Sequence, residues 1–321
     1  MGVVRLVTSR LSKVVQLERR TPLGFRRLDL LASGFLSDRA YLYPERPTRR
    51  RGYVSDYAIE FTLGRINRSE AKLRVNDKGI FAEQLTAAGL GTRAPKLYGT
   101  VDRGVVDLVV DPAVIETRGA VLKPRKGSQG RGVARVASVD EMRSRQRDGY
   151  LVQELVEQAS YAAAIWPGAL NTIRVLGVRD ADGPFVGPAA HRFGAAGTGV
   201  VDNFSAGGFV ARVWDGGILS PLAAKPTTRQ RVIHDRHPDT GGQVTGTVVP
   251  CWPEAQQLVI DLMGAFPDLL HVGWDLAVTD HGPVVIEGNA GVANLNVFQA
   301  HGPVLADERL RRFYRSHGVV R

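Results

Sequence analysis

Three oxygen-bearing side chains near the C-terminus have the types and spacing of a metal site. Asp275 lies at the start of one apolar run, and Glu287 and Asn289 end the next run, after a turn at residues 279–282. Two apolar runs broken by a glycine-containing turn predict a β-hairpin. Residues two apart share one face of a strand, and hairpin pairing would put Asp275 opposite them. Two carboxylates and an amide oxygen suit Mg²⁺ carrying nucleotide phosphates, with a solvated polar strand end as the alternative.

A glycine-rich segment between two short apolar runs has the pattern of a flexible flap. Residues 120–124 and 133–136 are each expected to form a strand, and Lys123 lies on the first of them. Glycines let backbone N–H groups approach an anion, and Ser128 adds a hydroxyl donor. The segment is neither a Walker loop nor a Rossmann fingerprint, because no helix follows it directly. The glycines that give the flap this character are Gly127, Gly130 and Gly132.

Two further cations occupy positions where an anion could meet them. Lys78 follows Asp77, which can cap a predicted helix, so Lys78 lies at the positive end of that helix or is an ordinary solvated lysine. Arg174 falls inside an alternating strand over residues 171–178, where an arginine is costly unless it meets an anion. Both positions are compatible with a phosphate site.

An apolar strand predicted over residues 150–156 contains two polar residues, Gln153 and Glu154. Polar groups inside such a strand need partners. A strand that leaves a nucleotide pocket can use its backbone and an adjacent acid to bind adenine and ribose. Capping of neighbouring loops is the alternative.

Composition limits the class of protein. The chain has 321 residues, 44% apolar and 23% charged, so we expect two or three subdomains in an ordinary globular protein. A net charge of +10 suits an anionic ligand. The single cysteine, Cys251, excludes an internal disulfide framework and is compatible with a reducing compartment. No signal peptide and no run of about 18 apolar residues is found, so we expect a cytoplasmic protein without a membrane partner.

The first 70 residues are strongly basic and are expected to be mostly helical, with a break near Thr21 and Pro22 and a further helix over residues 55–66. The run Arg49–Arg51 is either a solvated surface or a binding patch for an acidic partner. We rank binding of nucleic acid low, because aromatic residues are only 7% of the chain and Tyr53 alone lies near the basic run.

Taken together and in this order, these segments resemble the ATP-grasp superfamily, and within it the branch described as sugar-transfer-associated ATP-grasp proteins. The resemblance covers roughly residues 73–300. It is carried by the segments Asn76–Lys78, Val121–Pro124 with the flap to Gly132, Val152–Glu154, Asn171–Arg174, Val201–Asn203 with Gly207 and Gly208, His237–Gly241, Gly246–Pro250, Gly273–Asp275 and Glu287–Asn289.

The resemblance implies an α+β fold in which two subdomains clasp ATP. The division it implies is a basic N-terminal region over residues 1–75, a small subdomain with the flap over 76–155, and a large subdomain with the metal site over 156–321. The implied activity is an ATP-dependent ligase that activates a carboxylate as an acylphosphate and joins it to an amine. A phosphotransferase acting on a hydroxyl group of a small molecule or glycoconjugate is the alternative.

The resemblance also implies roles for individual residues. Arg174 and Lys123 would be catalytic, and Asp275, Glu287 and Asn289 would bind Mg²⁺, or Mn²⁺ in its place. Small-molecule or peptide-like carboxylates and amines would be the substrates, with a homodimer as one form of assembly. The loop after Asn289 lacks the Pro-Gly of many amino-acid ligases, which weakens any transfer of their specificity. The implied nucleotide-binding residues are Lys78, Lys123, Lys126, Gly127, Ser128, Gly130, Gly132, Gln153, Glu154, Leu155, Val156, Gln158, Asn203 and Lys225.

Overall fold

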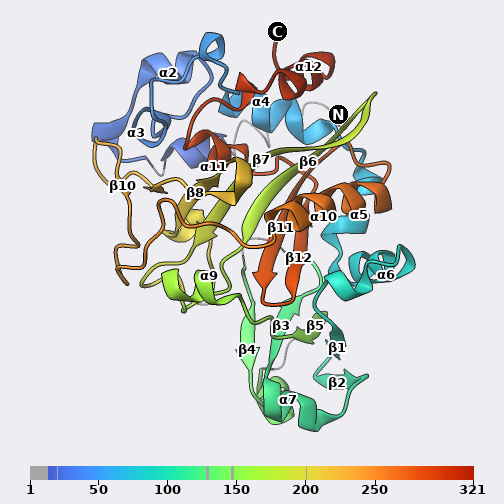
Figure 1. The fold of residues 1–321 in the computed structure, drawn as a ribbon. Coiled ribbons are helices and arrows are strands. Elements are labelled where there is room, and N and C mark those ends of the chain that lie inside the picture. The colour runs from blue at the N-terminus through green and yellow to red at the C-terminus, as the bar shows by residue number, and fades with distance from the viewer. Residues whose placement is uncertain (1–13, 20, 128–129, 146–147, 200) are drawn as a thin grey trace.

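Two antiparallel sheets and the helices that cover them form the molecule (Figure 1). The computed structural model describes residues 14–19, 21–127, 130–145, 148–199 and 201–321, so the helix predicted at the start of the chain lies partly outside the described residues. The five-stranded sheet has the order β2-β1-β5-β3-β4 and the seven-stranded sheet the order β10-β9-β8-β7-β6-β11-β12. Their strands are β1 (Leu97–Asp102), β2 (Val105–Leu108), β3 (Ala120–Pro124), β4 (Ala134–Val136), β5 (Tyr150–Glu154), β6 (Ile173–Asp180), β7 (Gly183–Phe193), β8 (Phe209–Val213), β9 (Leu222–Ala224), β10 (Ile233–His234), β11 (His271–Thr279) and β12 (Gly282–Asn289).

The small sheet has a core of its own. Helices α7 (Pro112–Arg118) and α8 (Val139–Ser144) pack on it, and Figure 1 shows this unit with α7 at the bottom of the view. Ile115 and Met142 from the two helices are fully buried against strand residues such as Val152. The polar caps Asp111 and Ser138 accept hydrogen bonds from the first turns of α7 and α8, which fixes where each helix begins.

The large sheet is covered on both faces, as its sequence of nearly continuous apolar residues requires. Neighbouring residues of β6 enter different cores, Val175 on one face and Leu176 on the other. One face packs against α5 (Ser69–Asn76), α6 (Lys78–Ala87) and α10 (Trp252–Ala265), and the other against the N-terminal helices, α11 (Leu295–Gln299) and α12 (Glu308–Ser316). The short helix α9 (Ser160–Ile165) follows the small sheet along the chain.

The N-terminal region is helical as expected, but its helices are short. Pro22, Gly34 and Gly52 interrupt the chain, because proline lacks an N–H donor and the two glycines adopt a positive φ. The predicted helix over residues 55–66 is divided into α4, capped by Ser55, and a 3₁₀ turn. Residues 14–19 are helical, and the elements after them are η1 (Leu23–Phe25), α2 (Leu28–Ala32), α3 (Arg39–Leu42), η2 (Arg49–Arg51), α4 (Asp56–Phe61) and η3 (Leu63–Arg65).

This region is attached to the large sheet rather than standing apart from it. Gln299 of α11 accepts a hydrogen bond from the backbone N–H of Val54 at 2.7 Å, and its amide group donates to the Val54 carbonyl and to the Tyr43 hydroxyl. Asn67 donates to the carbonyls of His271 and Ala290. In the part of the chain that is described, no helix is long and apolar enough to cross a membrane.

The hairpin predicted near the C-terminus is confirmed. In the β11–β12 ladder Asp275 lies opposite Glu287, and Gly273 lies opposite Asn289. A bulge follows Asp275, so the register shifts by one residue toward the turn. The hairpin therefore brings the three oxygen-bearing side chains to one end of the large sheet, where it meets the small sheet.

Candidate active site

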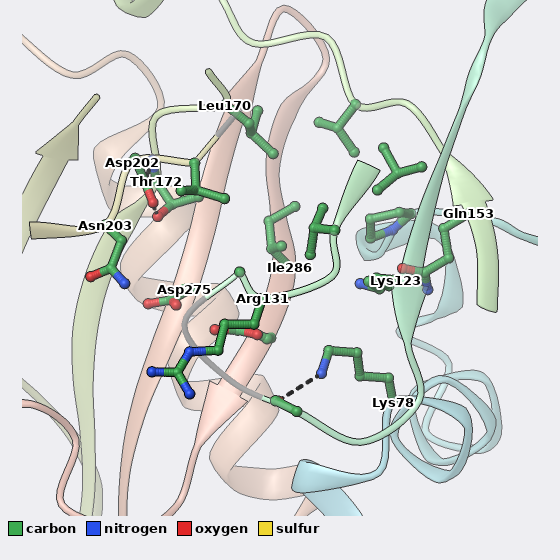
Figure 2. A pocket seen from close by; sticks show the side chains of 18 of the residues that line it. Lys78, Lys123, Arg131, Gln153, Leu170, Thr172, Asp202, Asn203, Asp275 and Ile286 are labelled. Carbon is green, nitrogen blue, oxygen red and sulfur yellow. Dashed lines mark hydrogen bonds between the residues drawn. The ribbon is translucent and has the colours of Figure 1, made fainter. Parts of the chain in front are cut away.

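A cavity of about 360 Å³ lies between the two sheets. The small sheet contributes residues of β3 and β5 and the flap, and the large sheet contributes residues of β6, β7 and the β11–β12 hairpin. Figure 2 shows Lys78 and Lys123 on one side of this space and Asp202, Asn203 and Thr172 on the other. The residues predicted for the site that line the cavity are Lys78, Lys123, Gly127, Gly130, Gln153, Glu154, Leu155, Val156, Arg174, Asn203, Asp275, Glu287 and Asn289.

The three predicted metal ligands converge in the cavity. The Asn289 amide nitrogen lies 3.4 Å from Asp275 Oδ2 and 3.5 Å from Glu287 Oε1. Burial and the neighbouring Asp275 carboxylate raise the pKa of Glu287. Among the described residues no group of three or more His, Cys, Asp or Glu is placed to hold a metal, and the predicted set has two carboxylates and one amide. Their role as ligands stays a prediction.

Asp275 is also held by two arginines from the neighbouring strands. Arg174 donates from Nε to Oδ1 at 2.7 Å and from Nη2 to Oδ2 at 2.6 Å. Arg192 on β7 places Nη2 3.0 Å from the same Oδ2. Burial alone would raise the pKa of Asp275, but the two arginines outweigh it and lower this pKa to about 2. Asp275 is therefore ionised at neutral pH.

Arg192 extends this network to a second buried carboxylate. Its Nη2 lies 3.5 Å from Asp202 Oδ1, and Thr172 donates its backbone N–H and its hydroxyl to Asp202 Oδ2 at 2.7 and 2.5 Å. Burial raises the pKa of Asp202. The network leaves Arg174 Nη1 buried and without a hydrogen-bond partner among the described residues. Because Arg174 lines the cavity, this N–H group is a donor that a bound anion could satisfy.

The two lysines approach the cavity from the opposite side. Lys78, the first residue of α6 after the cap Asp77, donates from Nζ to the carbonyl of Gly127 in the flap at 3.1 Å (Figure 2). Lys123 on β3 is buried and makes no ion pair with any described residue. Burial, with a contribution from Lys78, lowers the pKa of Lys123 to about 8, although Glu287 acts in the opposite direction. A nearby anion would therefore stabilise its charged form.

The flap is anchored at its base and fits closely at its tip. Arg125 donates from Nε to Asp77 Oδ1 at 2.7 Å, and its carbonyl accepts from the backbone N–H of Lys78. Gly130 has a φ of +68°, and a Cβ atom there would lie 2.4 Å from Val201 Cγ1. Only glycine fits this position without movement of its surroundings. The flap therefore contacts the loop of the large sheet across the cavity.

The end of β5 provides a less polar part of the cavity. Glu154 accepts a hydrogen bond from the backbone N–H of Lys96 at 3.2 Å, and its own backbone N–H donates to the Lys96 carbonyl. The chain then passes through Leu155 and Val156, which line the cavity together with Val121, Leu170 and Ile286. These side chains form an apolar slot in the cavity, and an apolar lining suits a purine base.

Several predicted residues lie elsewhere. The Gln158 amide accepts from Asn171 and donates to the Trp166 carbonyl, so it supports a turn and does not line the cavity. Lys225 is exposed and lies near Asp38. Gly132 packs toward Tyr150 outside the lining, and Ser128 lies outside the described residues. Lys126 lines a separate cavity of about 340 Å³, which also touches Lys78, Gly127 and Asn289.

A comparison with known protein families shows which family the chain belongs to. The model of the family described as "Sugar-transfer associated ATP-grasp" matches residues 58–314. The chain belongs to this ATP-grasp family. Its mixed α+β structure with two antiparallel sheets and a helical N-terminal region agrees with the fold expected from the sequence. No curated protein matches the chain by sequence.

The solved structures that are similar to the chain are so at low identity. N5-carboxyaminoimidazole ribonucleotide synthetase from Thermotoga maritima is 14% identical with a TM-score of 0.39, over 70% of this chain and 44% of that one. L-amino acid ligase from Bacillus licheniformis is 12% identical with a TM-score of 0.44, over 71% and 43%. The ATP-grasp ligase PsnB complexed with minimal precursor is 15% identical with a TM-score of 0.44, over 78% and 64%. The chain thus spans less than two thirds of each of these proteins.

Some residues of this ATP-grasp cavity were missed from the sequence. Arg192, Thr172 and Arg131 all line it, and none was assigned a role. Arg192 carried the same signal as Arg174, an arginine inside an apolar strand. Thr172 carried no distinguishing signal, because threonine is common in strands. Arg131 lies between two flap glycines and resembles a solvated surface cation in the sequence.

ATP and Mg²⁺ fit the residues that the cavity presents. Lys123 and the unpaired Nη1 of Arg174 are buried cationic groups that an anionic chain of phosphates would satisfy. Asn289 can turn its amide so that the oxygen, rather than the nitrogen, faces the carboxylates of Asp275 and Glu287. That orientation gives the set of three hard oxygen ligands that Mg²⁺ prefers.

Proposed function

We propose that the protein is an ATP- and Mg²⁺-dependent ligase that activates a carboxylate as an acylphosphate and joins it to an amine. The observation that carries the proposal is the meeting of Lys78, Lys123 and the unpaired Nη1 of Arg174 with the Asp275 trio in one cavity. Family membership supports the nucleotide-binding part of this proposal.

The nucleotide would lie with adenine in the slot at the end of β5. Gln153 and Glu154 line this slot, and the backbone at Leu155 offers an N–H and a carbonyl to the base edge. Lys78 and Lys123 would neutralise phosphate oxygens from the small-sheet side, and the backbone of the flap would cover them. These groups bind and orient the γ-phosphate before any reaction.

In the first step a carboxylate oxygen of the substrate attacks the γ-phosphorus, and the bond to the β–γ bridging oxygen breaks, which leaves ADP. Arg174 Nη1 would donate to the oxygens of the phosphoryl group as charge spreads over them. Bound Mg²⁺ would neutralise charge on the phosphates. Asp275 keeps the guanidinium of Arg174 in place, since it accepts two of its N–H groups, and Arg192 contacts the same carboxylate.

In the second step the free amine attacks the carbonyl carbon of the acylphosphate, and inorganic phosphate leaves. Water competes for the same carbon, so the site must be enclosed while the intermediate exists. The contact of Gly130 with Val201 would provide this enclosure above the phosphates.

The experiment is a screen of the purified full chain for ADP release over pooled carboxylates and amines, with mass spectrometry of the products. The proposal expects ADP, free phosphate and an amide product in equal amounts. A product that retains the phosphate on a hydroxyl group would replace the ligase by a phosphotransferase.

A further inference from the structure

A second cavity, of about 430 Å³, opens beside the proposed ATP site. Arg131, Asn203 and Asn294 line both cavities, so the two spaces adjoin at these residues. The other walls come from the N-terminal region and from the segments that follow β7 and β12. None of the groups that carry the two proposed steps lines this second cavity. A molecule in it would therefore lie next to the ATP site without displacing the nucleotide.

The charged groups on the walls of this cavity already have partners within the fold. Arg39 donates from Nη2 to Asp56 Oδ1 at 2.8 Å, and Asp56 Oδ2 accepts from the backbone N–H of Leu36 at 2.9 Å. Asp38 lies 3.2 Å from Arg39 Nη1. Glu60, the other acid in the lining, also interacts with other parts of the protein. Neither acid of the lining therefore calls for a cationic group on a ligand.

The arginine at the junction of the two cavities differs from these paired groups. Arg131 is exposed and forms no ion pair with any described residue. Figure 2 shows its guanidinium on the side of Asn203 and Asp275, away from Lys78 and Lys123. Because a guanidinium binds a carboxylate through two parallel hydrogen bonds, Arg131 favours the anionic end of a ligand at the junction.

Two asparagines give the second cavity neutral hydrogen-bonding groups. Asn294 and Asn296 alternate with Ala293, Leu295 and Val297, whose burial leaves the two amides on the side of the cavity. Neither amide forms a hydrogen bond with another described side chain or backbone group. An amide both donates and accepts, so the two asparagines complement an uncharged amide of a ligand. The apolar part of the wall consists of Val14, Leu17, Leu36, Ile59, Ala206 and Val292.

We propose that the second cavity binds the carboxylate substrate, and that this substrate is an N-acylated amino acid, as at the carboxyl end of a peptide. Its carboxylate would lie at Arg131, beside the position of the γ-phosphate, and its amide at Asn294 and Asn296. A second charge on the ligand would leave water for a wall whose acids already have partners, which costs free energy. The inference rests on the proposed ligase function for the reaction, but the binding itself can be measured without turnover.

The test uses calorimetry on the full chain saturated with Mg²⁺ and a non-hydrolysable ATP analogue. The probes are N-acetylleucine, leucine and 4-methylpentanoate, which share the carboxylate and the branched apolar chain. They differ only in the group next to the carboxylate, which is an acetamide, an ammonium group or hydrogen.

N-acetylleucine should bind most tightly of the three probes. We expect leucine to bind about tenfold more weakly, because its ammonium group loses water without gaining an unpaired acid. We expect 4-methylpentanoate to bind about threefold to tenfold more weakly, because it lacks the amide hydrogen bonds. Leucine binding as tightly as N-acetylleucine, or binding of none of the probes, would overturn the inference.

Variants locate the two contacts. Arg131→Gln should weaken all three probes about tenfold or more, because each has the same carboxylate. Arg118→Gln, at an exposed arginine outside both cavities, is the matched control and should leave the three affinities unchanged. Asn296→Leu keeps the size of the side chain and removes its amide, so N-acetylleucine should lose most of its advantage over 4-methylpentanoate. An unchanged affinity in Arg131→Gln, or an unchanged advantage in Asn296→Leu, would contradict the assignment.

A parallel assay separates this inference from the proposed function. ADP and hydroxamate are measured with each probe in the presence of hydroxylamine. Selective binding of N-acetylleucine without hydroxamate would leave the cavity assignment intact and contradict the ligase proposal. Hydroxamate formed from leucine as efficiently as from N-acetylleucine would support the ligase and overturn the cavity assignment.

Discussion

Arg174 and Asp275 lie opposite each other on the adjacent strands β6 and β11 and form a two-contact ion pair in the interior. The contacts measure 2.7 and 2.6 Å, and the side chains are 2% and 1% exposed. The strand register thus fixes a guanidinium beside the proposed metal ligands. We expect both the stability of the large sheet and the proposed phosphoryl transfer to depend on this pair.

Removal of one partner of this pair should destabilise the protein strongly. Arg174→Met leaves the Asp275 carboxylate buried with Arg192 as its remaining partner, and we expect a loss of about 3 kcal/mol in the free energy of unfolding. Urea unfolding followed by circular dichroism measures it. The Arg174→Met/Asp275→Leu double variant should lose less than the sum of the single variants.

The control for this experiment is the more exposed pair of Arg309 and Asp180, with contacts of 2.8 and 2.7 Å. Their side chains are 32% and 19% exposed, so Arg309→Met should cost no more than about 1 kcal/mol. If Arg174→Met cost as little as Arg309→Met, the Asp275 carboxylate would not depend on this pair.

Loss of Lys123 should weaken ATP binding without unfolding the protein. A buried lysine with a pKa lowered to about 8 gains a partner when phosphate binds. Lys123→Met should therefore raise the Kd for the Mg²⁺-free nucleotide by about tenfold to a hundredfold, the value of one or two charge-assisted contacts. Lys96→Met, at an exposed lysine outside the cavity, serves as the control. Undiminished ATP affinity in Lys123→Met would remove the phosphate role from this residue.

A side chain at the tip of the flap should impair turnover more than stability. Gly130→Ala meets both a positive φ and Val201 Cγ1 at 2.4 Å, so the flap would have to move away from the large sheet. We expect the KM for ATP to rise about tenfold in the ADP-release assay. Gly104→Ala also has a positive φ but meets nothing within 4 Å, so it should leave KM unchanged. Equal KM values for the two variants would show that the close contact is not needed.

The free energy of unfolding should fall as the pH is lowered, because buried histidines are neutral in the folded chain and take up protons when it unfolds. His271 is fully buried, and its Nε2 lies 2.8 Å from the Tyr314 hydroxyl; burial lowers its pKa to about 3. The unfolded chain binds a proton near pH 6.5, whereas the folded chain does not, so stability is full above that value and is lost as the pH falls toward 3.

The slope from one such histidine is about 1.4 kcal/mol per pH unit. Urea unfolding between about pH 7 and pH 5 should show this change in the free energy of unfolding. His271→Gln should reduce the slope by the contribution of one bound proton. Burial also lowers the pKa of His191 to about 3, so His191 would account for part of the slope that remains in the variant. An identical slope in the His271→Gln variant would contradict the assignment.

The sequence predicted the parts of the fold that local patterns determine. The strand Ala120–Pro124 was expected at the same bounds, and the β11–β12 hairpin follows from two apolar runs around a glycine turn. The strand β2 and the helix α7 were not predicted, because Val105–Leu108 is short and half exposed. The helix expected before Pro22 lies partly outside the described residues, and its residues 14–19 are helical. The helix expected after Pro22 is divided into η1 and α2, and the one expected over residues 55–66 is divided into α4 and η3.

The cavity was predicted less completely than the fold. Residues carried by motifs, such as Lys123 and Glu287, could be named because their type and spacing suggest chemistry. The pairing of Arg174 with Asp275 could not be predicted, because the two residues are 101 positions apart and meet only because β6 and β11 are neighbours in the sheet. Arg192 reaches the site from β7 by the same means.

The most direct test of the central claim is the fate of the carboxylate oxygen. A carboxylate that supports ADP release is labelled with heavy oxygen, and the inorganic phosphate formed with Mg²⁺, ATP and an amine is examined by mass spectrometry. Formation of an acylphosphate predicts one labelled oxygen in each released phosphate. Amide formed with unlabelled phosphate would contradict activation of the carboxylate by ATP in this way.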